Sequence, residues 1–182
     1  RGHLDGSARL LGAGQALGSD LTFARAEAEL RYEGAVSKPE GRSVERSVVA
    51  ARLRGGWGSG GVPVEEMYAL GVSFDADIPL RAHPLTRDGI IGRNPVGRSF
   101  ALLNAEWRQR LLHRSVFDVG VVAFADVGGV WRPAQGSDGG ILVDVGLGLR
   151  VSLLGGATLR IDQAWGLRDR SRSLFIGLNQ AF

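Results

Sequence analysis

The chain has 182 residues, of which 44% are hydrophobic and 23% are charged, and its 28 glycines are about twice the usual share. This composition excludes a disordered tail, and no stretch approaches the roughly eighteen uncharged apolar residues that a membrane-spanning helix needs. The absence of cysteine excludes disulfides, thiolate metal sites and cysteine nucleophiles.

The 22 basic and 19 acidic residues give a net charge of +3, and both signs occur in the same segments. A nucleic-acid surface would need a stripe of one sign, so we expect no nucleic-acid partner. The sequence begins at Arg1, without a methionine or an apolar signal segment. We therefore expect it to be a piece of a longer chain.

Apolar residues alternate with polar or small residues along nearly the whole sequence, which is the period of a β-strand rather than of a helix. The alternation predicts eight strands, most of them longer than the usual five or six residues. In chain order they lie near residues 3–11, 20–32, 45–57, 98–111, 115–127, 140–154, 157–165 and 174–182.

The two registers of these strands differ in chemistry. One register is apolar, with residues such as Leu30, Leu53, Leu103, Val121 and Ile161. The opposite register carries both signs of charge, at Arg25, Glu27, Glu29, Arg31, Arg46, Arg52, Arg54, Glu106, Arg108, Asp126, Asp144, Arg150, Arg160 and Asp162. A soluble sandwich or closed barrel would turn the apolar register inward, whereas a membrane barrel would turn it toward lipid.

Strand length favours the membrane barrel, because a tilted strand needs about nine to eleven residues to cross the hydrocarbon core. Aromatic residues near the ends of the apolar register suit the girdles of such a barrel, namely Trp57, Trp107, Trp165 and Phe182. The glycines of the last strands are expected to leave room for bulky neighbours, namely Gly128, Gly129, Gly146 and Gly148.

A long connection runs from about residue 58 to residue 97 and contains four of the six prolines. Connections of this length are usually functional or disordered. This one also holds apolar residues such as Val64, Leu70 and Phe74. We therefore expect it to have a function.

Three motifs in and after this connection resemble those of the bacterial surface-antigen barrel family, which includes BamA, TamA and the two-partner-secretion transporters. Leu80-Arg81-Ala82-His83 is similar to the family's hydrophobic-Arg-Gly-aromatic signature, with alanine and histidine at its last two positions. Phe124-Ala125-Asp126-Val127-Gly128 resembles its Phe-x-Asp-x-Gly motif. Asn104-Ala105-Glu106-Trp107-Arg108 is similar to its Asn-x-Glu-aromatic-Arg strand.

The resemblance implies an all-β fold, an antiparallel transmembrane β-barrel, of which residues 1–182 form the C-terminal part with about eight of sixteen strands. It implies that the long connection, about residues 58–97, folds into the lumen and that its arginine meets an acid on the barrel wall. The residues concerned would be Arg81, His83, Phe124, Asp126 and Gly128. Glu106 and Asp144 are competing acids, because both lie in the charged register of their strands. Without the paired motifs, a solvated loop arginine would be the usual interpretation of Arg81.

The resemblance also implies that the terminal Phe182 closes the last strand and completes a targeting signal. The implied function is insertion of outer-membrane proteins, or translocation of polypeptides, in the bacterial outer membrane. Partners would be membrane lipid, polypeptide clients, and periplasmic or lipoprotein accessory subunits. An anchoring barrel for an upstream enzyme, such as a patatin-like lipase, and a soluble all-β binding module are the alternatives.

We expect neither an enzyme active site nor a cofactor. The three histidines, His3, His83 and His113, are too far apart in sequence to suggest a metal site, and no zinc or calcium motif occurs. No nucleotide-binding glycine motif and no nucleophile elbow is present.

Overall fold

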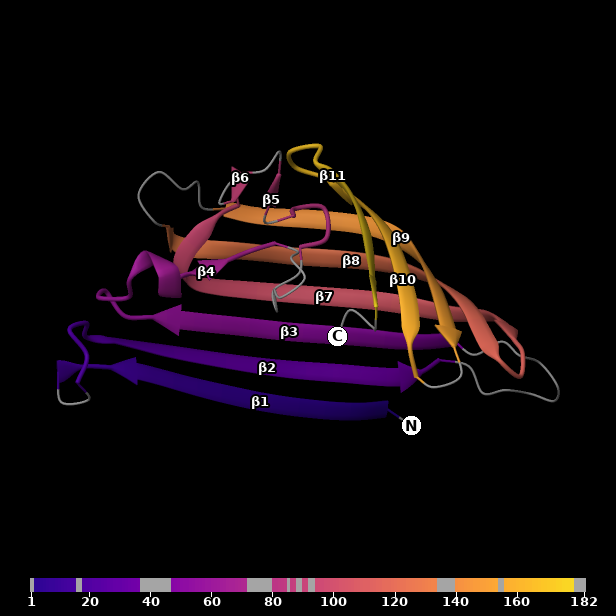
Figure 1. Cartoon of the computed structure of the whole chain (residues 1–182), viewed down its shortest axis with the longest axis horizontal. Helices are drawn as coiled ribbons and strands as arrows, with labels where there is room; N and C mark the ends of the chain where they lie inside the picture. Colours follow the sequence, from indigo (N-terminus) through magenta and orange to yellow (C-terminus); the bar gives the residue numbers. More distant parts are fainter. Residues whose placement is uncertain are drawn as a thin grey trace.

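The computed structural model describes residues 2–15, 18–36, 47–71, 80–84, 86–87, 90–91, 94–133, 140–153 and 156–178. Its main feature is one antiparallel sheet in which eight long strands lie in chain order (Figure 1). They are β1 (Gly2–Ala13), β2 (Phe23–Ala35), β3 (Ser47–Gly58), β7 (Val96–His113), β8 (Phe117–Pro133), β9 (Gly140–Leu153), β10 (Thr158–Gly166) and β11 (Arg172–Leu178). The eight predicted strands and the all-β antiparallel class are confirmed.

The other elements belong to the connection between β3 and β7. A single 3-10 turn, η2 (Val64–Glu66), precedes the short strand β4 (Tyr68–Ala69), which pairs with the start of β7. Two further short strands, β5 (Thr86–Arg87) and β6 (Ile90–Ile91), pair with each other. Within the described ranges, no helix has the length and apolar character needed to cross a membrane.

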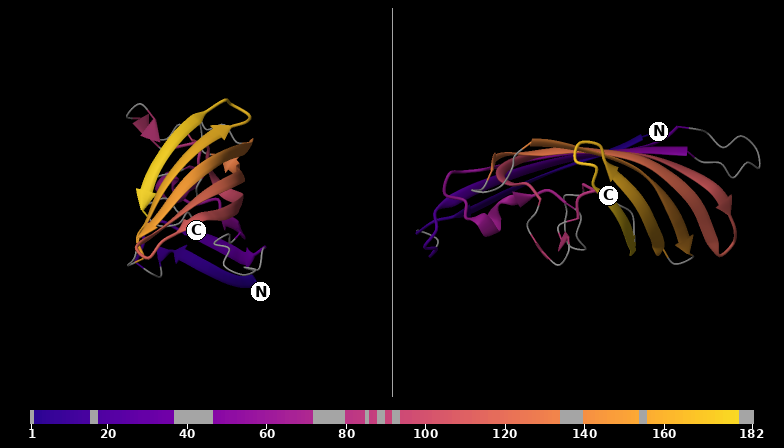
Figure 2. Two further views of the ribbon diagram at one scale, coloured as in Figure 1. Left: turned by 90° about the vertical axis from the view of Figure 1, so that its right-hand side faces the viewer. Right: turned by 90° about the horizontal axis from the view of Figure 1, so that it is seen from above.

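The sheet is arched and does not close on itself (Figure 2). In the described part of the chain, its two edges are β1 and β11, and each pairs with a single neighbour. The β3–β7 connection lies on the concave side of the arch. This shape is consistent with part of a barrel, because unpaired strand edges would leave backbone groups unsatisfied in lipid.

The two faces of the sheet have opposite chemistry. On the convex face, apolar side chains are open to the surroundings, with Leu30 50% exposed and Leu147 60% exposed. On the concave face, charged side chains such as Arg52, Glu106 and Asp144 are buried. These strands therefore have the outward apolar register expected of a membrane barrel, and not the inward one of a soluble sandwich. The connection packs on the charged register of the central strands and leaves the apolar register bare.

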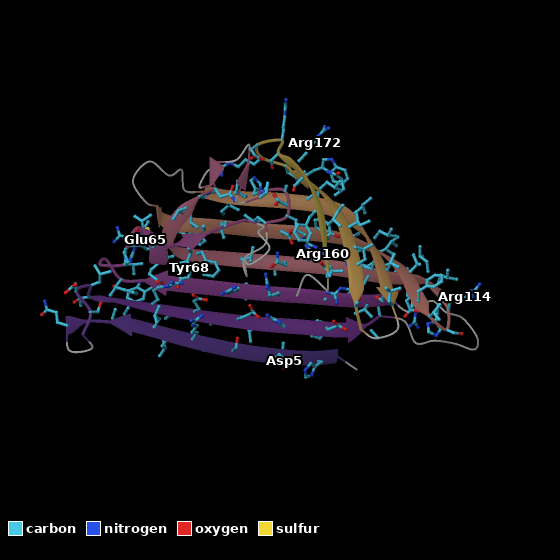
Figure 3. All side chains as sticks on the ribbon, in the orientation of Figure 1. Asp5, Glu65, Tyr68, Arg114, Arg160 and Arg172 are labelled. Carbon is cyan, nitrogen blue, oxygen red and sulfur yellow. The ribbon has the colours of Figure 1, made fainter. Side chains whose placement is uncertain are left out.

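An apolar cluster on the concave face holds the connection against the sheet. It consists of Tyr68, Leu70, Leu80, Phe100, Leu102 and Val130, so that residues of the connection pack on residues of β7 and β8. The Tyr68 and Phe100 rings lie 4.5 Å apart between centroids. Figure 3 shows Tyr68 and Arg160 over the sheet, and Glu65 and Arg114 at opposite ends of the long strands.

Glycines on the concave face make room for large neighbours, as the sequence predicts. A methyl group at Gly146 would overlap the Phe124 ring, and one at Gly148 would overlap the carboxylate of Asp162. At Gly128 a methyl group would lie 3.0 Å from Leu102 and 3.6 Å from Leu70, so this glycine lets the connection approach β8.

The aromatic residues of the convex face depart in part from the expected arrangement. Trp57 lies one residue before the end of β3, as predicted, and is 47% exposed. Trp107 lies inside β7 rather than at its end, because β7 continues to His113 through a bulge between Arg110 and Leu112. Trp131 is 48% exposed near the end of β8 and was not predicted. Phe182 lies outside the described residues.

Candidate functional site

A short stretch of the connection, the anchor segment (residues 80–84), is buried against the concave face. The first three residues, Leu80, Arg81 and Ala82, have no exposed surface. Leu80 belongs to the apolar cluster described above, and Ala82 packs in a second cluster with Val122, Phe124 and Ala164. Apolar packing therefore places the polar groups of the segment next to the charged register of β7, β8 and β9.

Arg81 lies at the centre of the site. Its guanidinium forms a two-pronged contact with Asp126, from Nε to Oδ2 at 2.7 Å and from Nη2 to Oδ1 at 2.6 Å. Its Nη1 donates to Oε1 of Glu106, and its Cζ lies 3.6 Å from the centre of the Phe124 ring. The segment thus brings one cation to two carboxylates and an aromatic face, which are the strongest partners of a guanidinium.

The carboxylates around Arg81 are themselves satisfied by further side chains. Asn104 donates to Asp126 Oδ1 at 2.7 Å, and Arg52 donates to the Asn104 amide oxygen at 3.1 and 3.2 Å. Arg108 donates to Glu106 Oε2 at 2.7 Å. A network of this kind keeps buried charges paired, and pairing is the condition under which their desolvation is tolerated.

A further acid of this network is Asp162 on β10. It accepts hydrogen bonds from Arg150 at 2.5 Å and from Arg160 at 2.6 Å. Asp162 Oδ2 also lies 3.9 Å from Arg81 Nη1. Burial by itself lowers the pKa of Arg81, but the hydrogen bond and charge of Asp126, with the charges of Glu106 and Asp162, raise it. Arg81 therefore stays charged in this buried position.

The rest of the anchor segment is held by Asp144 of β9. The backbone N–H of Ala82 donates to Asp144 Oδ2 at 2.7 Å, and His83 Nδ1 lies 2.9 Å from Asp144 Oδ1. Ala82 does not adopt a positive φ. Alanine in place of the glycine of the resembled signature therefore costs no backbone strain here.

His83 also reaches the turn between β10 and β11. Its Nε2 lies 3.0 Å from Asp169 Oδ2 and 3.3 Å from Ser171 Oγ. Burial by itself lowers the pKa of His83, but the hydrogen bond and charge of Asp144 and the charge of Asp169 raise it overall. Burial raises the pKa of Asp169, but hydrogen bonds from Ser171 and the charge of His83 lower it overall.

Ser171, His83 and Asp144 stand in the order of a serine–histidine–acid catalytic triad. Such a triad needs Nε2 free to accept the serine proton. Here Nε2 also faces the Asp169 carboxylate, so in the doubly protonated ring it carries a proton of its own and does not accept from Ser171. In that state the contacts of this group attach the anchor segment to the turn electrostatically.

The structure brings most of the sequence-predicted site residues together. Arg81, His83, Phe124, Asp126, Glu106 and Asp144 form one connected group, and Gly128 borders it beneath Leu70. Asp126, Glu106 and Asp144 were considered as alternatives, but each holds a different atom of the anchor segment. The role of Phe182 stays a prediction, since that residue lies outside the described part.

Sequence reasoning missed Asp169, Ser171 and Asn94. Asp169 and Ser171 contact His83, and the Asn94 side chain donates to the His83 carbonyl at 3.0 Å. The replacement of an aromatic residue by His83 could have prompted a search for acids in the turns. In the part of the chain that the structure describes, no group of three or more His, Cys, Asp or Glu side chains could hold a metal ion.

Comparison with known proteins identifies the family. The Omp85 superfamily domain matches residues 5–173, which include most of β1, the six long strands from β2 to β10, the anchor segment and the first two residues of β11. No curated protein and no solved structure matches the chain. The match covers more than half of the sequence and agrees with the resemblance of the three motifs. The chain belongs to the Omp85 superfamily.

Proposed function

We propose that this chain is the C-terminal part of a bacterial outer-membrane barrel that inserts outer-membrane proteins or translocates polypeptides. Membership of the Omp85 superfamily supports the proposal. The exposed apolar convex face supports contact with membrane lipid, because lipid is the surrounding in which such a face is stable. Polypeptide clients and periplasmic or lipoprotein accessory subunits would be the other partners.

The observation that carries the proposal is the anchor segment on the concave face. A barrel that served only as a wide pore would not need a connection fixed inside it by a fully buried arginine. Fixing Arg81 between β7 and β8 determines how much of the interior the connection occupies. The interior can then guide a polypeptide by shape and charge, without a nucleotide or a metal.

The charged concave face suits this role. Arginines and acids of β2 and β3 form ion pairs there, such as Arg54 with Glu27 at 2.7 Å and Arg25 with Glu27 at 2.8 Å. Charged groups that are paired with one another offer few lasting contacts to an unfolded chain. Passage or temporary binding of a polypeptide is therefore compatible with this face.

The proposal is tested with the full-length protein in liposomes. Two clients are offered in separate assays: an unfolded outer-membrane barrel protein and an unfolded secreted polypeptide. We expect the protein to accelerate either folding of the first into the bilayer or delivery of the second across it, measured by protease protection. Arg81→Ala should slow that reaction, whereas Arg114→Ala, a change in an exposed turn, should not.

A folded protein that affects neither client would overturn the proposal. If it instead delivers only an enzyme domain of its own chain, the anchoring alternative is the correct one. The assembly of each variant is checked by its heat-modifiable mobility, so that a failure to fold is not mistaken for a loss of activity.

A further inference from the structure

His83 connects three segments that are far apart in the sequence. Its ring lies between Asp144 of β9 and Asp169 of the β10–β11 turn, at 2.9 Å and 3.0 Å from its two nitrogens. Its own backbone is fixed by a hydrogen bond from its N–H to the Leu80 carbonyl, at 3.0 Å. The imidazole is therefore the link between the anchor segment and the turn.

Both nitrogens of His83 face carboxylates, so each contact requires a proton on the nitrogen that makes it. A doubly protonated imidazolium has two N–H donors, whereas a neutral imidazole has one. Loss of one proton must therefore break one of the two contacts. The geometry decides which one breaks.

Asp144 has no exposed surface and Asp169 has a side chain that is 44% exposed. In the described part of the chain, Asp144 Oδ1 has no hydrogen-bond donor with good geometry, and its Oδ2 receives the Ala82 N–H and lies 3.1 Å from His83 Nδ1. Taking one of these donors from a buried carboxylate is costly, while water can hydrate the carboxylate of Asp169. The remaining proton therefore stays on Nδ1, and the contact with Asp169 is lost.

We propose that His83 is a proton-dependent switch that docks the β10–β11 turn on the anchor segment when the ring is doubly protonated and releases Asp169 when the ring is neutral. The neutral ring keeps Asp144, so the anchor segment itself stays in place. Ser171 Oγ, 3.3 Å from Nε2, can then donate to that nitrogen and limit how far the turn moves.

The groups that face His83 support this direction of change. Asp144 comes from β9, Asp169 and Ser171 come from the turn, and the backbone of Gly166 at the end of β10 approaches the ring. The nearest cation of the anchor segment is Arg81, whose charge is balanced by Glu106 and Asp126, with Asp162 at 3.9 Å. The carboxylates named here thus give the surroundings of the ring a net negative charge, which favours the doubly protonated ring.

The pH range follows from the sign of the shift. The pKa of His83 is raised above its ordinary value of 6.5, so the docked turn is fully stabilised below about pH 6.5. The stabilisation is lost as the pH rises through the higher value of the folded protein. Acidification over the same range does not release the turn, because the pKa of Asp169 is lowered.

The test uses the full-length protein in bilayers with a spin label on a cysteine at Leu167, a turn residue that is 61% exposed. This chain has no cysteine of its own, so within it the label is unique. The mobile fraction of the label is measured from pH 5.5 to pH 9. We expect it to rise in one transition, with a roughly tenfold change in the ratio of mobile to docked turn, or about 1.4 kcal/mol.

Two variants and one reference site control the result. His83→Tyr has no group that titrates below about pH 9, and should give a flat profile. Asp169→Asn, a change at a partly exposed position, should move the transition to lower pH, because one carboxylate that favours the imidazolium is gone. A label at Val64, which is also 61% exposed, should be independent of pH.

A wild-type profile without a transition would overturn the proposal. So would the same transition in His83→Tyr, or a transition that Asp169→Asn leaves in place. The His83 switch does not depend on which polypeptide the protein handles. It can therefore be disproved while the proposed function stands, and the proposed function can be disproved while the switch stands.

Discussion

At the scale of single residues, the site is governed by charge balance in a dry environment. Arg81, Glu106 and Asp126 all have 2% exposure or less, and water cannot replace a lost partner. A surface ion pair contributes about 0–1 kcal/mol, whereas breaking a buried pair costs about 3–5 kcal/mol. The position of the anchor segment should therefore be sensitive to each member of the network.

We expect Arg81→Ala and Asp126→Ala each to reduce insertion or translocation while the barrel still assembles. The double variant should be no worse than the worse single variant, because both changes break the same contact. Arg81→Lys should restore activity only in part, since an ammonium cannot make the two-pronged contact with Asp126. The measurement is a double-mutant cycle on the rate of the transport or insertion reaction.

Arg81→Ala should be at least as severe as Asp126→Ala, because it also removes the donor to Glu106 Oε1 and leaves that carboxylate with Arg108. Fully additive losses in the cycle would mean that the contact between Arg81 and Asp126 has no role in activity. Arg114→Ala is the matched control, since it removes an arginine from the exposed β7–β8 turn.

At the scale of the strand, the two registers of β9 have opposite requirements. The concave register includes glycines that lie under large side chains, and the convex register includes apolar residues that face outward. A substitution one position along the strand therefore tests a different physical effect.

Gly146→Ala should destabilise the barrel by about 1–3 kcal/mol, as expected for overpacking. Its methyl group would overlap both the Phe124 ring and the carbonyl oxygen of Gln163, and the backbone atom cannot move aside. Gly12→Ala in β1 is the control, because the nearest atom to its methyl group is 3.9 Å away. The difference is measured by urea unfolding in bilayers, and equal stability of the two variants would contradict this description of the concave face.

Val145→Arg should impair folding into bilayers by about 2–4 kcal/mol if this position lies near the membrane midplane. Val145 is in the register that faces outward on β9, between Ala125 of β8 and Trp165 of β10. Leu167→Arg in the exposed turn is the control for adding an arginine. If both variants fold equally well in bilayers, the convex face is not in contact with lipid.

At the scale of the whole molecule, the sheet leaves two edges open. In the described residues, β1 and β11 lack a second neighbour, and lipid offers no hydrogen bonds to an open edge. The open sheet of eight long strands is therefore consistent with part of a barrel. The closing seam would involve β11, whose described part ends at Leu178.

Deletion of Phe182 from the full-length protein should lower the amount that assembles in outer membranes. The alternation of Leu174, Ile176 and Leu178 leads to this aromatic residue, a pattern that resembles the targeting signal of the family. Abundance in isolated membranes and heat-modifiable mobility are the measurements. Replacement of Phe182 by tyrosine is the control, and unchanged assembly after deletion would count against a signal at this position.

The sequence by itself determined the eight strands and the composition of their two faces. Both are local properties, because the alternation of Leu147, Leu149 and Val151 with Gly148 and Arg150 imposes a period of two wherever the strand lies. The sequence also marked Arg81, Asp126 and Glu106 through their motifs and Asp144 through its place in the charged register. It could not say which face is covered, since alternation is the same for a soluble sheet and a membrane sheet.

The tertiary structure decided the rest. Asp126, Glu106 and Asp144 come from three strands, and pairing places Asn104 beside Asp126 and Asp126 beside Asp144. This register lets one short segment contact all three acids. The sequence left open which acid binds the segment, and in the structure all three do. Asp169 and Ser171 reach His83 from more than eighty residues away in the chain, through the arch of the sheet. Side-chain partners so distant in sequence carry no local signal, because their meeting depends on strand register and curvature, and only the folded sheet supplies these.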